Sequence, residues 1–212
     1  MKKLILFSLF VGLFLTQAAI GQANLVINTP HGFDDATWNT TDQVCITCHT
    51  PHDGTNSAGE VLWSHELSLA TYTVYSSPTL DAGAPAGTLG DPSGNSKLCL
   101  SCHDGTVALN NFVGNGSPAD EFAAAYGVDV SNDLSNDHPI SFTYDAALVT
   151  ADQTTNGGVV GLNDPTANPI SGMLFGGEMQ CASCHDPHNN LNGNFLVMSN
   201  SGSALCYTCH IK

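Results

Sequence analysis

The sequence predicts a loop-rich fold with short helices and few short strands. The chain of 212 residues contains 21 glycines and 10 prolines, and both residue types favour turns over long regular elements. It shows no long amphipathic helix and no heptad repeat. A third observation is a C-x-x-C-H motif that occurs four times and uses all eight cysteines. We therefore expect the chain to wrap around whatever these motifs bind.

The spacing within each motif indicates covalent haem. Two thiols three positions apart can bond to the two vinyl groups along one porphyrin edge, and the histidine that follows becomes the proximal iron ligand. The alternatives, a disulfide framework or zinc, do not require a histidine after every pair. The sequence thus predicts four haem c groups, with iron. Their attachment residues are Cys45, Cys48 and His49; Cys99, Cys102 and His103; Cys181, Cys184 and His185; and Cys206, Cys209 and His210.

Five further histidines are available as second axial ligands, and bis-histidine ligation of four haems needs four of them. The chain looks internally duplicated, because residues 45–56 align without gaps with 181–192, and 96–103 with 203–210. This duplication predicts the following partners: His31 for His49, His52 for His103, His138 for His185, and His188 for His210. His65 is left over as an ordinary polar or propionate-facing residue, with a distal role as the alternative.

The N-terminus predicts export. Residues 1–23 have two lysines, an apolar run over 4–15 and small residues near position 23, which is typical of a secretory signal peptide. The run is too short to span a bilayer, although a retained anchor is the alternative. Residues 24–212 are expected to form one tetrahaem domain with duplicated halves at about 24–116 and 117–212. Within it we expect a short helix over 120–126 and a loop over 150–177.

Acidic residues dominate the charge. The chain has 19 Asp and Glu against four Lys and Arg, a formal net charge of −15. Nucleic acid and anionic membranes are therefore poor partners, and redox partner cytochromes or extracellular metal and mineral acceptors are better ones. Because every motif ends in histidine and spare histidines are plentiful, we expect electron transfer and no enzymatic activity. A reductase of a small nitrogen oxyanion is the alternative.

Several segments resemble the multihaem c-type cytochromes with doubled CxxCH motifs: CHTPH, LWSHELS, SKLCLSCHDGTV, NDHPISFTYDAAL and QCASCHDPHN. The resemblance covers most of residues 28–212. With four expected haems, the chain is similar to the tetrahaem cytochromes that form extracellular filaments (the OmcE type). It implies four stacked haems in a homopolymer at the cell surface, in which His31 ligates a haem of the neighbouring subunit. A soluble periplasmic tetrahaem shuttle is the alternative.

Overall fold

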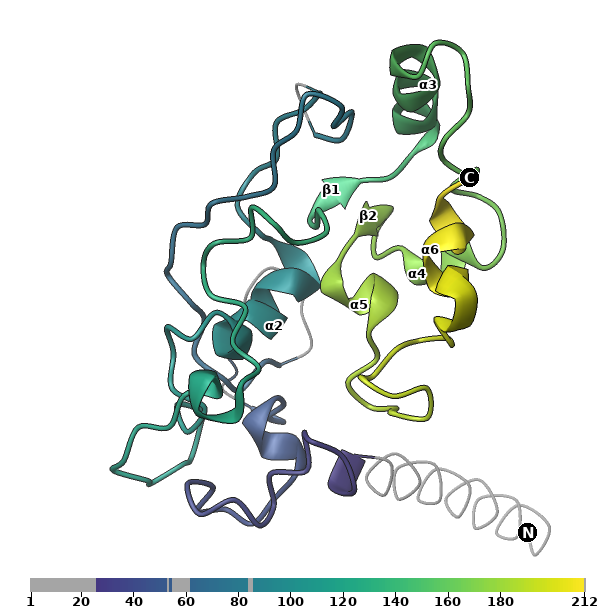
Figure 1. Cartoon of the computed structure of the whole chain (residues 1–212). Helices are drawn as coiled ribbons and strands as arrows, with labels where there is room; N and C mark the ends of the chain where they lie inside the picture. Colours follow the sequence, from purple (N-terminus) through teal and green to yellow (C-terminus); the bar gives the residue numbers. More distant parts are fainter. Residues whose placement is uncertain (1–25, 53, 55–61, 84–85, 212) are drawn as a thin grey trace, which may run out of the picture.

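The fold is loop-rich with short helices, as predicted (Figure 1). The computed structural model describes residues 26–52, 54, 62–83 and 86–211, so the expected signal peptide lies outside the described residues. The elements in chain order are η1 (Cys45–Thr47), α2 (Gly94–His103), η2 (Ala123–Tyr126), β1 (Phe142–Thr143), α3 (Ala146–Thr155), α4 (Ile170–Met173), β2 (Glu178–Met179), α5 (Cys181–Cys184), η3 (Ser201–Ser203) and α6 (Ala204–Cys209).

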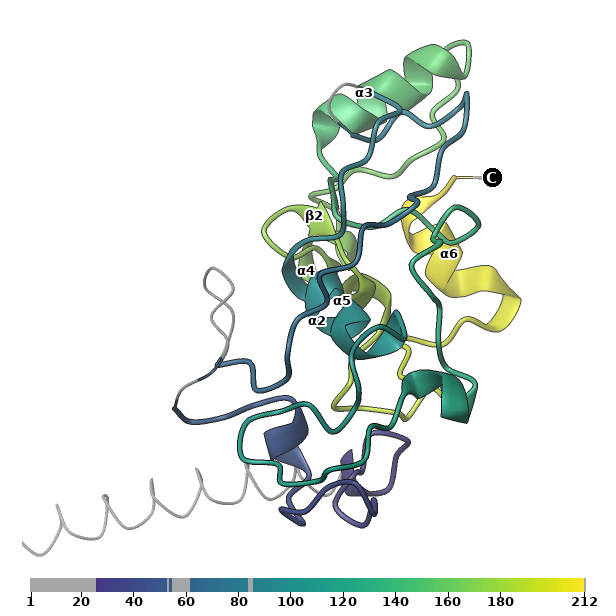
Figure 2. The same cartoon turned by 90° about the vertical axis from the view of Figure 1, so that its left-hand side faces the viewer.

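Two helices meet at the centre of the described chain. Figures 1 and 2 both show α2 beside α5, and these two helices are in direct contact. The short strands β1 and β2 pair antiparallel, with Phe142 opposite Met179, and β2 leads directly into α5. Since α2 carries the second C-x-x-C-H motif and α5 the third, this contact joins the two halves of the sequence.

The prediction of a loop over residues 150–177 is wrong in part. Helix α3 extends to Thr155 and α4 also lies in this range. Asp145 caps α3, because its Oδ1 accepts a hydrogen bond from the Leu148 amide at 2.9 Å, and the alanines that follow are strong helix formers. The short helix expected over 120–126 appears as η2, which ends at Gly127 with a φ of 67°.

The buried apolar side chains form three separate clusters. One surrounds Tyr144 and Ile170, a second surrounds Trp38 and Phe112, and the third surrounds Tyr72. A domain of this length usually builds one contiguous core. The division of the apolar core into three clusters is the pattern expected of a chain that wraps around large apolar cofactors. Among the described residues, no helix has the length and apolar character needed to cross a membrane.

Candidate functional site

Three of the C-x-x-C-H motifs fold in the same way around the first cysteine. The amide of the motif histidine donates a hydrogen bond back to the carbonyl of that cysteine, at 2.8 Å for His49, 3.0 Å for His185 and 2.9 Å for His210. In one helical turn, positions i and i+3 share a face, so the two thiols of each pair point the same way. All eight cysteines are free thiols and are available for covalent bonds to a cofactor.

After the helical turn, His185 and His210 adopt extended backbone. A returning segment pairs with three of the motif histidines in antiparallel bridges: Trp63 with His49, Leu196 with His185, and Leu162 with His210. His103 instead ends the longer helix α2, and its carbonyl accepts the Val130 amide at 2.7 Å. Each proximal histidine is therefore fixed by a segment outside its own motif.

Local carbonyls orient two of the motif imidazoles. Nδ1 of His103 donates to the Val128 carbonyl at 2.9 Å, and Nδ1 of His185 donates to the Asn194 carbonyl at 2.8 Å. A proton held on Nδ1 leaves the lone pair on Nε2, which is the arrangement that histidine ligands of metals commonly adopt.

Thiols of consecutive motifs are neighbours. The neighbouring Cys99 thiol lowers the pKa of Cys181 to about 7. Burial raises the pKa of Cys102, and the nearby Cys48 raises it further. Burial likewise raises the pKa of Cys209 to about 11, with an added contribution from Cys184. The first motif thus adjoins the second, the second adjoins the third, and the third adjoins the fourth.

Reciprocal capping joins the second and third motifs. Oε1 of Gln180 accepts the Ser96 amide at 3.0 Å in the first turn of α2, and Oγ of Ser96 accepts the Cys181 amide at 2.9 Å in the first turn of α5. The Ser96 hydroxyl also donates to Gln180 at 2.5 Å. First-turn amides have no partner within their own helix, so each helix supplies the other with the missing acceptor.

A cavity of about 400 Å³ lies against the first motif, and its lining includes Cys45, Ile46, His49 and Leu62. This volume is within the usual range for small-molecule and cofactor sites. Beside it in the sequence, the buried hydroxyls of Thr47 and Ser64 have no hydrogen-bond partner among the described residues. An apolar hollow that presents a thiol and an imidazole fits covalent attachment of a porphyrin.

Three pairs of histidine rings lie about 6 Å apart. The ring centroids are separated by 6.1 Å for His49 and His188, 6.1 Å for His31 and His103, and 6.3 Å for His138 and His210. Each pair joins one motif histidine to one of the additional histidines, which is the combination that an iron with two axial imidazoles requires. The pairs differ from those expected from the duplication, in which His31 goes with His49, His138 with His185 and His188 with His210.

His31 lies in a half-buried aromatic site. Its ring stacks on Phe195 with centroids 4.4 Å apart and an angle of 16°. Burial lowers the pKa of His31 to about 4, and repulsion from His103 contributes, while a hydrogen bond to the Pro187 carbonyl opposes the shift. The imidazole is therefore neutral at physiological pH and keeps a lone pair for ligation.

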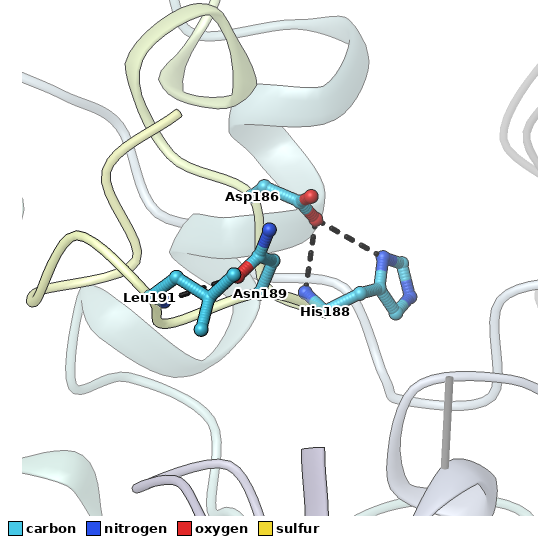
Figure 3. Close-up of polar contacts among 4 residues, drawn as sticks. All are labelled: Asp186, His188, Asn189 and Leu191. Atoms are coloured by element: carbon cyan, nitrogen blue, oxygen red, sulfur yellow. Dashed lines mark hydrogen bonds and ion pairs between the residues drawn. The ribbon is translucent and has the colours of Figure 1, made fainter. Parts of the chain in front are cut away.

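A carboxylate orients His188 (Figure 3). Oδ1 of Asp186 accepts the His188 amide at 3.0 Å and lies 3.3 Å from Nδ1 of the same residue. His138 has a comparable contact, because its Nδ1 donates to the Pro139 carbonyl at 2.8 Å. Sequence reasoning missed the role of Asp186, although a carboxylate two residues before a candidate ligand is a readable signal.

His65 differs from the candidate ligands. It is fully buried, and its Nδ1 and Nε2 lie 2.8 Å and 2.9 Å from the carbonyl oxygens of Glu66 and Ala108. Both ring nitrogens thus face backbone oxygen. His52 is exposed, and within the described part of the chain neither His52 nor His185 forms a close ring pair. Among the same residues, no group of three or more His, Cys, Asp or Glu side chains is arranged to hold a metal ion. The close ring contacts between histidines are therefore pairs.

The second half of the chain matches a known family. Residues 175–212, which contain the third and fourth motifs, match the doubled CXXCH motif family. No curated protein matches the chain. The family match and the motifs indicate covalently bound haem c and support a multihaem c-type cytochrome that transfers electrons.

Proposed function

We propose that this protein binds four haem c groups, one at each motif, and passes electrons between them along the chain. When bound, haem supplies an iron that alternates between the ferric and ferrous states. The cysteines would hold each porphyrin covalently, and the histidines would ligate the irons. The surrounding loops exclude water and set the potential of each iron through burial and hydrogen bonding.

The observation that carries this proposal is the proximity of consecutive attachment sites, which is direct where α2 packs on α5. The thiols of Cys48 and Cys102, of Cys99 and Cys181, and of Cys184 and Cys209 are near enough to shift one another's pKa. Cofactors bonded to neighbouring thiols lie close together. Four of them would follow one another in the order of the sequence, which is the arrangement that stepwise electron transfer needs.

The test is the haem content and redox behaviour of the exported protein. Mass spectrometry should find four porphyrins per chain, and a reductive titration should reduce all four irons reversibly. Fewer than four covalent porphyrins, or irons that cannot be reduced in turn, would contradict the proposal.

We also propose that the protein is exported and assembles into a filament that delivers electrons to an extracellular acceptor. The ring of His31 lies beside His103 of the same chain, which favours a role for His31 within its own subunit over the one that the resemblance suggests. Exposed His52 is the better candidate, with His185 as the ring it would complete. Electron microscopy of the haem-loaded protein separates this assembly from a soluble periplasmic shuttle, and His52→Gly should leave subunits that do not polymerise.

One observation favours a second candidate function. No ring pairs with His185 in the described part of the chain; if His52 of a neighbouring subunit does not ligate it, an iron held there would be accessible to a small molecule. The protein would then be a reductase, for example of a small nitrogen oxyanion. Stoichiometric binding of carbon monoxide to the reduced protein would support this function. The absence of binding would favour electron transfer alone.

A further inference from the structure

We propose that the irons take their second axial ligands across the two halves of the chain: His188 for the iron at His49, His31 for the iron at His103, and His138 for the iron at His210. This inference rests on the proposed function, because it assigns ligands to haems that the motifs would bind. It replaces the pairing within each half that the internal duplication suggests.

The ring separations carry the assignment. A metal–nitrogen bond is about 2 Å long, and a ring nitrogen lies roughly 1 Å from the centre of its imidazole. Two imidazoles on opposite sides of one iron therefore have centroids about 6 Å apart. The three observed separations are 6.1, 6.1 and 6.3 Å. The stacked contact between His31 and Phe195, at 4.4 Å, is much closer.

The polar contacts of two of the three distal rings agree with this role. Nδ1 of His188 faces the Asp186 carboxylate, and Nδ1 of His138 donates to the Pro139 carbonyl. Each of these two rings uses one nitrogen for a local oxygen and keeps the other for iron. His65 has an oxygen at both nitrogens and is therefore outside this ligand set.

The packing of α2 on α5 explains why the ligands cross between the halves. The two helices bring the third motif against the second, and the thiol of Cys48 in the first motif lies beside Cys102 in the second. The loop that follows α5 then carries His188 to the ring of His49. An N-terminal half alone does not contain this ligand.

The ring angles give each pair a separate spectroscopic signature. The rings of His49 and His188 are nearly parallel at 13°, whereas the other two pairs are twisted by 58° and 72°. Parallel axial imidazoles separate the energies of the two iron orbitals that interact with them, and a ferric low-spin iron then gives a rhombic electron paramagnetic resonance spectrum. Strongly twisted rings leave these orbitals nearly equal in energy and give a highly anisotropic signal with one large g value.

The experiment compares His188→Met with His138→Met in the full chain and in a Cys206→Ala/Cys209→Ala background that lacks the fourth haem. Methionine ligation is read from the sulfur-to-iron absorption band of the ferric protein. We expect His188→Met to gain this band in both backgrounds and to lose the rhombic signal. His138→Met should gain the band in the full chain and fail to gain it without the fourth haem. The reverse pattern would overturn the assignment and support pairing within each half.

A glycine series guards against a variant that does not fold. His188→Gly should convert about one iron per chain to the high-spin state, and added imidazole should restore the low-spin spectrum. The comparison variant is His52→Gly, which changes the same position of the first motif; it can free only the iron at His185, so the rhombic signal of the iron at His49 should stay intact. A His188→Gly protein that stays fully low-spin without imidazole would refute the assignment. Haem content and reversible reduction are measured on the same samples, so a failure of the proposed function would be seen separately.

Discussion

Replacing Ser96 by alanine should loosen the joint between the second and third haem sites. Ser96 is fully buried and its Oγ accepts the Cys181 amide at 2.9 Å, so the substitution leaves this amide without an acceptor. An unsatisfied buried donor costs about 1–3 kcal/mol. The lost bond to Gln180 adds about 1 kcal/mol, because Oε1 of Gln180 keeps the Ser96 amide and the Ser141 hydroxyl as donors. We expect the free energy of unfolding to fall by roughly 2–4 kcal/mol.

The assay is guanidinium unfolding of the haem-loaded protein, with the midpoint and the m-value compared to those of the unchanged chain. Ser101→Ala is the matched control, because Ser101 is a fully buried serine of the same helix whose hydroxyl donates only locally, to the Leu98 carbonyl at 2.6 Å. It should cost at most about 1 kcal/mol. Equal losses for the two variants would refute the idea that Ser96 acts as a cap between helices.

Four further predictions concern other contacts. Tyr72→Phe should lower the free energy of unfolding by roughly 1.5–3 kcal/mol, measured by denaturant titration, because the Tyr72 hydroxyl donates to the buried Asp104 carboxylate at 2.6 Å; no change would show that this bond is not stabilising. Gly94→Ala should lower the free energy of unfolding by about 1–2 kcal/mol in the same titration, because Gly94 has a φ of 51°. The loss should exceed that of Gly114→Ala, because a Cβ added at Gly94 would lie 3.1 Å from Nε2 of Gln180. Asp186→Asn should raise the reduction potential of one iron, because the His188 ring loses a carboxylate that increases its basicity; an unchanged redox titration would argue against this contact. A chain produced without haem should lose its near-ultraviolet circular dichroism and expand, as the three small apolar clusters are the main peptide core; a compact, ordered apoprotein would contradict this.

Hydrogen bonds also determine how the protein responds to acid at Asp104. Burial alone would raise the pKa of this carboxyl, but hydrogen bonds from Ser68, Tyr72 and Thr106 outweigh it, and the pKa is lowered. The ionised carboxylate therefore stabilises the fold above the unfolded pKa of about 3.9. This stabilisation is lost as the pH falls through the lower, folded value. Asp104→Asn should be less stable at neutral pH and should lose less stability on acidification, as measured by unfolding midpoints across that range.

The sequence predicts best what is local. A cysteine pair followed by histidine must form one helical turn for its thiols to share a face, so the fold of each motif follows from its spacing. The loop-rich character follows from the glycine and proline content. The N-terminus of α3 was also readable from Asp145 and the alanines after it, but it was hidden by the composition of residues 150–177 as a whole.

The pairing of the histidine rings was not readable in the same way. Pairing within each half would require each half to be self-contained. The identities of residues 96 and 180 alone do not indicate that the two helices cap each other. The position of His188 beside His49 depends on this non-local packing. The character of His65 likewise depends on the Ala108 carbonyl, 43 positions away in the sequence, which faces its Nε2.

The contact between His49 and His188 has a consequence for how the protein matures. On the proposed export, the chain would present the first attachment site long before residue 188 had crossed the membrane. On the proposed assignment, the first iron to be bound would then be among the last to receive its second ligand. Until then that iron would remain accessible to small external ligands, and only a fully translocated chain would protect it from side reactions.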